Sequence, residues 1–262
     1  FMAATMTSVM DTPDKVPTYI EHCKDMGIKI LPPDINESGE KFNVVGGNIR
    51  YAMSAVKNVG REAVRKIVAE REAGGKYSSL GDLCGRLQLN KKMLESLIRC
   101  GALDSMGYNR ATLLASMDRA LELSKKLAQN KEDAQLSLFD FGLDTSQQQP
   151  EVEMVEMKEF SVKELLDMEK EMIGFYVSGH PFDAYEPYVS RKATGSIAGL
   201  LEMDEESDVT AAGLISGLIQ RYTKKGDLMG SFQLEDKKGV IHCTAFPKAY
   251  EQCRDMLVNG AT

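Results

Sequence analysis

The sequence contains no tryptophan, only three histidines and only five cysteines among its 262 residues. The histidines are far apart and no C-x-x-C pair is present, so the spacings of common zinc sites are missing. Scattered cysteines of odd number are typical of a reduced protein. No run approaches the ~18 apolar residues of a membrane span, and no secretory leader is recognisable. We therefore expect a cytoplasmic protein with no membrane partner and no metal site.

Signatures of catalysis are missing as well. The chain has no Walker motif, no nucleophile elbow and no carboxylates patterned for two-metal chemistry. Its densest acidic cluster, Asp204–Glu206 with Asp208, lies in a polar stretch, where solvated carboxylates are more common than metal ligands. The first residue is Phe1 rather than methionine, which suggests a piece of a longer protein. We expect no catalytic residue and no cofactor in this chain.

Charge is distributed unevenly. The net charge is −7, yet residues 50–110 hold twelve Lys/Arg against six Asp/Glu, a net of +6. Residues 150–171 hold three Lys/Arg against eight Asp/Glu, a net of −5. Surface charge can cluster by chance, but this asymmetry favours a modular protein with one basic face.

The basic segment contains a turn that we predict to bind phosphate. An apolar stretch leads into the turn at Gly60, and a helix follows until Gly74-Gly75 breaks it. The first amides of a helix lack intrahelical partners and carry partial positive charge, so with nearby cations they attract a nucleic-acid phosphate. The alternative is an ordinary helical hairpin in a core. The predicted DNA-binding residues are Lys57, Asn58, Gly60, Arg61, Arg65 and Lys66.

A second helix–turn–helix follows the first. Ser79 is expected to cap a short helix over 80–87, and Asn90 a helix over 91–100. The turn after it is less sharp and is flanked by Arg99 and Arg110, with a long helix following from there to residue 134. Ahead of the first turn, the pattern predicts helices over 1–12 and up to Gly27, a strand over 28–31 and a hairpin over 42–52.

A short apolar peptide precedes a polar linker that ends at Pro150. Large apolar groups beside a linker would be exposed unless they fold back, and exposed apolar clusters mark partner sites. A glutamine amide can hydrogen-bond while Leu138 and Phe139 fill an apolar pocket. The candidate anchor residues are Gln135, Leu138 and Phe139.

The last part of the chain changes character. An acidic amphipathic helix is predicted over 158–176, and three strands over 209–223, 228–235 and 240–246, with a helix from Pro247 to Leu257. Three meandering strands and a helix make up most of a small barrel. Aromatic and basic residues at the first turn, Tyr222, Lys224 and Lys225, are candidate contacts for single-stranded nucleic acid.

Three stretches resemble one known family. They are Phe1–Thr7, Gly27–Asn36 and Gly174–Pro181, and together they resemble the C-terminal third of the C-family bacterial replicative DNA polymerases, the DNA polymerase III alpha subunits. The resemblance covers almost the whole chain. It implies a fragment of a DNA-directed DNA polymerase, a nucleotidyltransferase of DNA replication whose palm aspartates and Mg²⁺ would lie upstream of this sequence.

The resemblance also implies a mainly α, multi-module fold that ends in a truncated β OB-fold. Its modules would be the end of the fingers domain (1–50), a tandem helix-hairpin-helix DNA-binding domain (51–134), a clamp-binding peptide with linker (135–150), an acidic helix and connector (151–205) and a partial OB-fold (206–262). The implied partners are duplex DNA, the beta sliding clamp and single-stranded DNA or other replisome subunits. The fragment would hold the product duplex and confer processivity.

The clamp motif agrees with the resemblance, and one hairpin position departs from it. Gln135, Leu138 and Phe139 fit the family's clamp motif, Gln-x-x-Leu-Phe, whereas Asn58 stands where a hairpin glycine is usual. Asparagine tolerates the left-handed backbone, so the turn remains plausible. Two alternatives stay open: a helix-hairpin-helix repair glycosylase or nuclease, for which Asp104 is the only nearby carboxylate, and an interaction scaffold with no nucleic acid, which the +6 segment disfavours.

Overall fold

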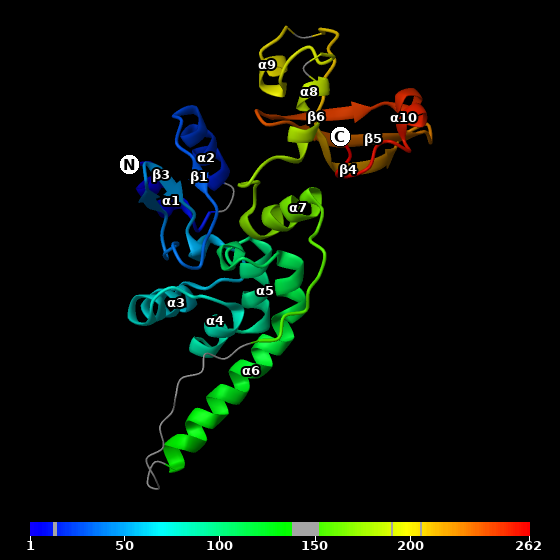
Figure 1. Ribbon diagram of the computed structural model, residues 1–262. Helices are drawn as coiled ribbons and strands as arrows, with labels where there is room; N and C mark the ends of the chain where they lie inside the picture. Colours follow the sequence, from blue (N-terminus) through cyan, green and yellow to red (C-terminus); the bar gives the residue numbers. More distant parts are fainter. Residues whose placement is uncertain (13–14, 138–151, 190, 205) are drawn as a thin grey trace. The chain divides into compact units, whose positions relative to one another are not determined.

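The computed structural model describes residues 1–12, 15–137, 152–189, 191–204 and 206–262. They form two compact units, Phe1–Ser178 and Gly179–Thr262 (Figure 1). The first unit is mainly helical and the second carries a three-stranded sheet, so the fold is mixed α/β. In the described part of the chain, no helix is both long and apolar enough to cross a membrane.

The first unit opens with two helices and a small sheet. The elements are α1 (Met2–Val9), α2 (Val16–Asp25), β1 (Ile30–Leu31), β2 (Asn43–Val45) and β3 (Asn48–Arg50). The sheet order is β1-β3-β2, with β1 parallel and β2 antiparallel to β3. The hairpin between β2 and β3 turns at Gly46 and Gly47, whose φ values of 58° and 80° suit a two-residue turn of type I′. The predicted hairpin is therefore confirmed.

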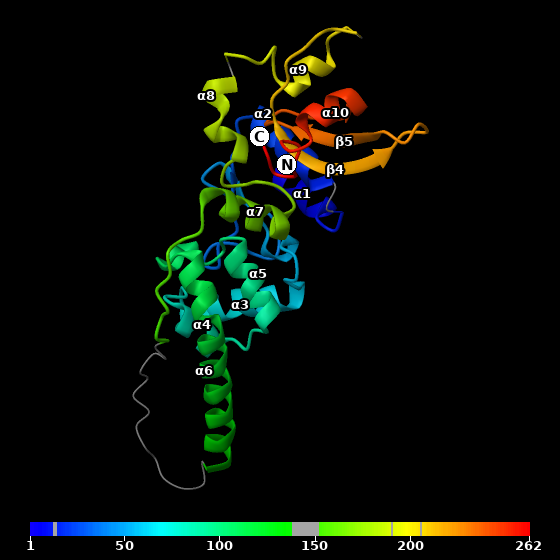
Figure 2. The same cartoon turned by 90° about the vertical axis from the view of Figure 1, so that its right-hand side faces the viewer.

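Helices make up the rest of this part. They are η2 (Met53–Ala55), α3 (Arg61–Gly74), α4 (Leu80–Arg86), α5 (Lys91–Arg99), η3 (Asp104–Met106) and α6 (Arg110–Ser137). The predicted caps of α4 and α5 are confirmed: Ser79 Oγ accepts from the amide of Asp82 at 3.1 Å, and Asn90 Oδ1 from that of Met93 at 2.8 Å. Figure 2 shows α6 extending well beyond α4 and α5.

One hydrophobic core joins the small sheet to the helices. Its fully buried members come from β3, α3, α4, α5 and α6, among them Ile49, Ile67, Leu83, Leu97 and Leu113. The side chain of Tyr51 lies between the two regions, and its ring contacts that of Phe42 edge-on, with the centroids 4.9 Å apart. Residues 1–50 and the helices that follow therefore fold as one body, and the finer module boundaries stay predictions.

An extended acidic segment, residues 152–161, lies along α6, and we call it the acidic strap. The amide of Val155 donates to Ser116 Oγ at 2.8 Å, and that of Met157 donates to Thr112 Oγ1 at 3.0 Å. These bonds hold the strap extended, so α7 (Val162–Ile173) begins four residues later than the predicted helix. A capping box between Ser161 and Glu164 fixes that start.

The second unit contains three antiparallel strands in the order β4-β5-β6. Its elements are η4 (Pro181–Ala184), α8 (Glu186–Val189), α9 (Ile197–Leu201), β4 (Leu214–Tyr222), β5 (Leu228–Glu235), β6 (Val240–Ala245) and α10 (Pro247–Cys253). Strand β4 has a bulge at Gly217, whose φ is 61°. The ring of Tyr250 on α10 packs directly over Gly230 of β5, where a Cβ would lie 2.7 Å from it. The predicted β-rich end is confirmed.

Candidate nucleic-acid interface

The hairpin of residues 57–60 is held from two sides. Asn58 adopts a φ of 64°, the left-handed conformation expected for it, and its Nδ2 donates to Ser96 Oγ of α5 at 3.0 Å. On the other side, the amide of Lys57 donates to the carbonyl of Met172 in α7 at 2.9 Å. The hairpin is thus fixed before any ligand arrives, which lowers the conformational cost of binding.

An open face of backbone amides lies at the start of α3. Gly60 is the N-cap residue and no side chain caps the helix. In the described part of the chain, the amides of Gly60, Arg61 and Glu62 have no acceptor. A Cβ built on Gly60 would meet no atom within 4 Å, so the space in front of the glycine is free. An anion can reach these amides without any rearrangement.

Four cationic side chains lie on the hairpin and the first two turns of α3, and they differ in whether they are paired with a carboxylate. Lys57 and Lys66 are exposed and have no ionic partner among the residues that the structure describes. Arg61 contacts both carboxylate oxygens of Asp11, at 2.8 and 2.6 Å. The fork of Arg65 binds Glu40 through Nε at 2.8 Å and Nη2 at 3.0 Å. The six predicted residues thus lie on the hairpin and the first two turns of α3, and two of them, Arg61 and Arg65, are paired with carboxylates.

Pairing between Arg65 and Glu40 shifts the pKa of both groups. Hydrogen bonds from Arg65 hold the pKa of Glu40 below its ordinary value. The same hydrogen bonds and the charge of Glu40 raise the pKa of Arg65. Both groups are therefore fully charged at neutral pH.

The second hairpin is filled by the protein itself. The guanidinium of Arg110 lies over Gly101, whose φ is 81°, and a Cβ built on that glycine would overlap it. Arg110 Nη2 contacts Asp104 Oδ2 at 2.7 Å, and its Nη1 donates to the carbonyl of Arg99 at 3.1 Å. The carbonyl of Ala102 accepts from the amide of Ile35 at 2.8 Å. This hairpin stabilises the domain and offers no open anion site comparable to the first.

Comparison with known proteins places these hairpins in a family. A model of the helix-hairpin-helix motif matches residues 27–113. The chain is 37% identical over 264 residues to DNA polymerase III subunit alpha of Borreliella burgdorferi, with 99% of this chain and 23% of that protein covered. The corresponding proteins of Saccharopolyspora erythraea and Thermus aquaticus are 36% and 38% identical, over 98% and 96% of this chain and 22% and 20% of theirs.

The chain belongs to the DNA polymerase III alpha-subunit family. It spans between a fifth and a quarter of the length of these relatives. Both hairpins of this family member fall inside the matched helix-hairpin-helix region, and so do the sheet β1-β3-β2 and helices α3 to α5.

Sequence reasoning missed the partners of the two arginines. Asp11 lies 50 residues from Arg61 and Glu40 lies 25 residues from Arg65, so no helical or strand spacing links them. The carbonyl of Met172, which accepts from the amide of Lys57, is more remote still in sequence. Only the tertiary fold of the alpha-subunit chain reveals these contacts.

The other predicted contact residues lie elsewhere. Gln135 is in the last turns of α6, while Leu138 and Phe139 lie outside the described residues. Tyr222 ends β4 and is exposed, and Lys224 and Lys225 occupy the exposed turn between β4 and β5. These three residues belong to the second unit, and their contact with single-stranded nucleic acid stays a prediction.

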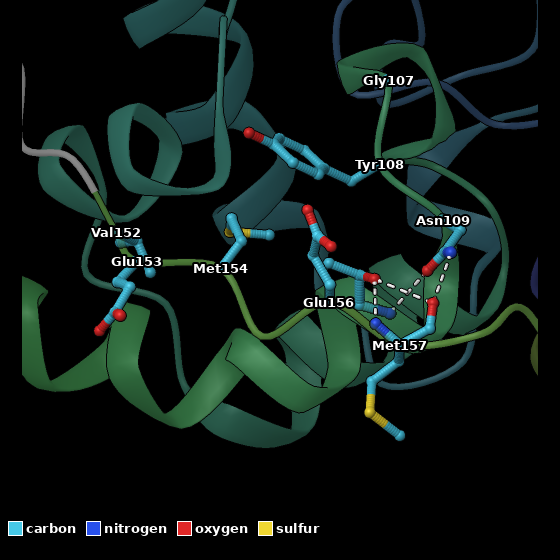
Figure 3. Close-up of a pocket in the computed structure, with 9 residues that line it drawn as sticks. Gly107, Tyr108, Asn109, Val152, Glu153, Met154, Glu156 and Met157 are labelled. Carbon is cyan, nitrogen blue, oxygen red and sulfur yellow. Dashed lines mark hydrogen bonds between the residues drawn. The ribbon is translucent and has the colours of Figure 1, made fainter.

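A cavity of about 730 Å³ lies between the acidic strap and the turn before α6 (Figure 3). Tyr108 stands on one side of it, and Met154 and Glu156 stand on the strap side. Asn109 Nδ2 donates to the carbonyl of Met157 at 2.9 Å and closes one end. None of the predicted site residues that the structure describes lines this cavity. In the described part of the family member, no group of three or more His, Cys, Asp or Glu side chains is placed to hold a metal ion.

Proposed function

We propose that this chain is the C-terminal part of a bacterial replicative DNA polymerase and that its first unit holds the duplex product. The observation that carries this proposal is the open amide face at Gly60, with Lys57 before it and Lys66 on α3, neither of which has an ionic partner among the described residues. A DNA phosphate is the anion we expect at this face. Backbone amides and lysine ammonium groups both donate hydrogen bonds to phosphate oxygens.

Such a grip is independent of base sequence. Contacts to phosphate fix the register of the protein on the duplex but read no bases. The hairpin presents no long polar side chain apart from its cations, and Asn58 is already bonded to Ser96. A polymerase must hold product duplexes of every base sequence, so binding that does not depend on base sequence fits this role.

Two of the three carboxylates of the acidic strap, those of Glu153 and Glu159, are engaged within the unit, which limits the repulsion that the strap can exert on DNA. Glu159 accepts from the amides of Arg110 and Ala111 and so caps α6, at 3.0 and 3.2 Å. Glu153 pairs with Arg119 at 3.3 Å. These contacts place negative charge at the N-terminus of a helix and beside a cation, where it is favoured.

The glycosylase or nuclease alternative receives no support from Asp104. Both oxygens of that carboxylate contact the guanidinium of Arg110, which is buried. A carboxylate whose two oxygens are both hydrogen-bonded to a buried arginine is poorly placed to take a proton from a substrate. The whole protein would be a DNA-directed DNA polymerase whose palm aspartates and Mg²⁺ lie outside this chain.

A salt titration tests the duplex grip. We expect the 262-residue chain to bind two duplexes of unrelated sequence equally, with an affinity that falls as salt rises. Contacts to two to four phosphates would give a slope of log K against log salt of about −2 to −4. Fluorescence anisotropy with labelled duplexes measures both quantities. Binding that ignores ionic strength, or that depends strongly on sequence, would contradict the proposal.

We also propose that Gln135, Leu138 and Phe139 bind the beta sliding clamp and that this tether gives processivity. The support is the match to the Gln-x-x-Leu-Phe pattern and the family of the chain. A tethered polymerase that releases DNA rebinds before it diffuses away, because its effective concentration stays high.

Replacing Leu138 and Phe139 with alanine should weaken clamp binding by the chain at least tenfold, since both apolar anchors are lost. Surface plasmon resonance on immobilised clamp measures the change. Leu136→Ala is the matched control, because position 136 is a variable position of the pattern, and it should retain most of the affinity. Equal affinities for all three proteins would refute this tether.

The second unit is proposed to be a partial OB-fold that contacts single-stranded DNA or another replisome subunit. Its three antiparallel strands and the exposed Tyr222, Lys224 and Lys225 support this assignment. An aromatic ring beside two cations can stack on a base while the cations neutralise phosphates.

A further inference from the structure

Two carboxylates occupy the arginines beside the hairpin. The Glu40 carboxylate meets Arg65 in a two-point fork, Nε to Oε2 and Nη2 to Oε1, at 2.8 and 3.0 Å. Asp11 contacts Arg61 through the single nitrogen Nη2. A carboxylate presents two oxygens to a guanidinium in the same manner as a phosphate does, so both acids hold positions that a phosphate could take.

The two carboxylates differ in how firmly they are placed. The loop before Glu40 is fixed to the helix, because Arg71 Nη1 donates to the carbonyls of Ile35 and Ser38 at 2.7 and 2.9 Å. The carbonyl of Gly39 also accepts from the amide of Met53 at 3.0 Å. The side chain of Glu40 is only 21% exposed. It is therefore held against α3 by its own backbone.

Asp11 has no such support. It follows the end of α1, its side chain is 78% exposed, and it shares one donor nitrogen between its two oxygens. An exposed pair of this kind contributes little and is screened by salt. Of the two acids, Glu40 is the stronger occupant of the arginine face.

We propose that Glu40, assisted by Asp11, sets the affinity of the hairpin for duplex DNA by occupying Arg65 and Arg61 until phosphates displace it. The inference rests on the proposed duplex grip. It assigns a role to two acids that bind these arginines without being DNA contacts themselves. Arg61 and Arg65 are exposed enough to exchange a carboxylate for a phosphate. Each arginine would contact the duplex only after it has released its carboxylate.

The test compares Glu40→Gln with wild type in the 262-residue chain. Glutamine keeps the size of the side chain but loses its charge, so the one ionic contact that Arg65 keeps among the described residues is the longer one to Glu62, at 3.9 Å, and its guanidinium can bind phosphate. We expect duplex affinity to rise about two- to fivefold for Glu40→Gln, less for Asp11→Asn, and roughly tenfold for both together, in line with the modest strength of exposed pairs. Anisotropy at fixed low salt measures the change, and melting curves confirm that each variant is folded.

Glu72→Gln is the charge-matched control. Glu72 lies on α3, the helix that carries Arg61 and Arg65. It is exposed and has no ionic partner among the described residues, so its neutralisation should leave the affinity unchanged. A direct readout uses the Nε–H resonance of Arg65, assigned by its loss in Arg65→Lys. This resonance should move when duplex is added to wild type, and should already be displaced in free Glu40→Gln.

The outcomes separate the two proposals. If Glu40→Gln leaves affinity unchanged or lowers it, while charge reversal at Lys57 and Lys66 still weakens binding, the pairs only join the N-terminal region to α3 and the inference is overturned. An equal gain from Glu72→Gln also overturns it, since general charge would then be the cause. If wild type and every variant fail to bind duplex, the proposed function itself is wrong.

Discussion

Replacing Lys57 and Lys66 together with glutamate should lower the affinity for duplex DNA about a hundredfold or more at ~0.1 M salt. These two side chains are the cations at the open amide face with no ionic partner among the described residues, so each is free to neutralise a phosphate. Loss of two phosphate contacts should also make the salt slope shallower by about 1.8. Anisotropy titrations across a salt series yield both numbers.

The lysines are a sharper test than the arginines. Arg61 and Arg65 already bind carboxylates, so glutamate at those positions would break two ion pairs and place like charges side by side. A loss of DNA binding there could come from a disturbed fold. Lys57 and Lys66 have no ionic partner among the described residues, so their replacement leaves no carboxylate unpaired.

The matched control is the pair Lys125→Glu and Lys126→Glu. Both lysines are exposed on α6 without ionic partners in the described residues, and the change in net charge is the same. If the duplex is held at the hairpin, this control should lose only a small part of the affinity. An equal loss in both double variants would mean that net charge alone drives binding, and would remove the hairpin from the interface.

Replacing Asp104 with asparagine should lower the free energy of unfolding of the first unit by about 2–4 kcal/mol. The side chain of Arg110 is only 8% exposed, and Asp104 is its ionic partner. Burial alone would lower the pKa of Arg110, but the hydrogen bonds and charge of Asp104 raise it above its ordinary value. Without the Asp104 carboxylate, the buried cation would keep only the charge of Glu169 and its bonds to backbone carbonyls. Asp104 is itself 48% exposed, which places the cost below that of a fully buried pair.

Urea denaturation measures this change. Glu153→Gln is the control, because it breaks the exposed pair with Arg119 and should alter stability by less than about 1 kcal/mol. Below its unfolding transition, Asp104→Asn should bind duplex as wild type does, since the second hairpin presents no open anion site. A stable but DNA-deficient Asp104→Asn protein would show instead that the second hairpin contacts phosphate.

Local signals in the sequence were sufficient for the elements that surround the hairpin. Ser79 and Asn90 cap the helices they were predicted to cap, and the left-handed Asn58 follows from the conformational tolerance of asparagine. The Gly46-Gly47 turn follows from the backbone freedom of glycine. Each of these depends on neighbours only a few residues away.

Contacts between remote segments could not be predicted in this way. The amide of Lys57 bonds to Met172, Arg110 lies over Gly101, and Glu40 binds Arg65, all through tertiary packing. The acidic helix begins at Val162 rather than at 158 because the strap bonds to α6. Binding residues can thus be named from the sequence, but whether their charges are free depends on the fold.

The length of α6 has a consequence for the geometry of replication. Its 28 residues rise about 1.5 Å each, so the helix is about 42 Å long, roughly the length of twelve base-pair steps. It begins at Arg110, beside the filled hairpin, and ends at Ser137, within the proposed clamp anchor of Gln135, Leu138 and Phe139. A helix cannot stretch as a coil can, so the proposed clamp anchor would lie at a set distance from the filled hairpin. Each residue inserted into α6 would also turn that attachment point by about 100° around the helix axis.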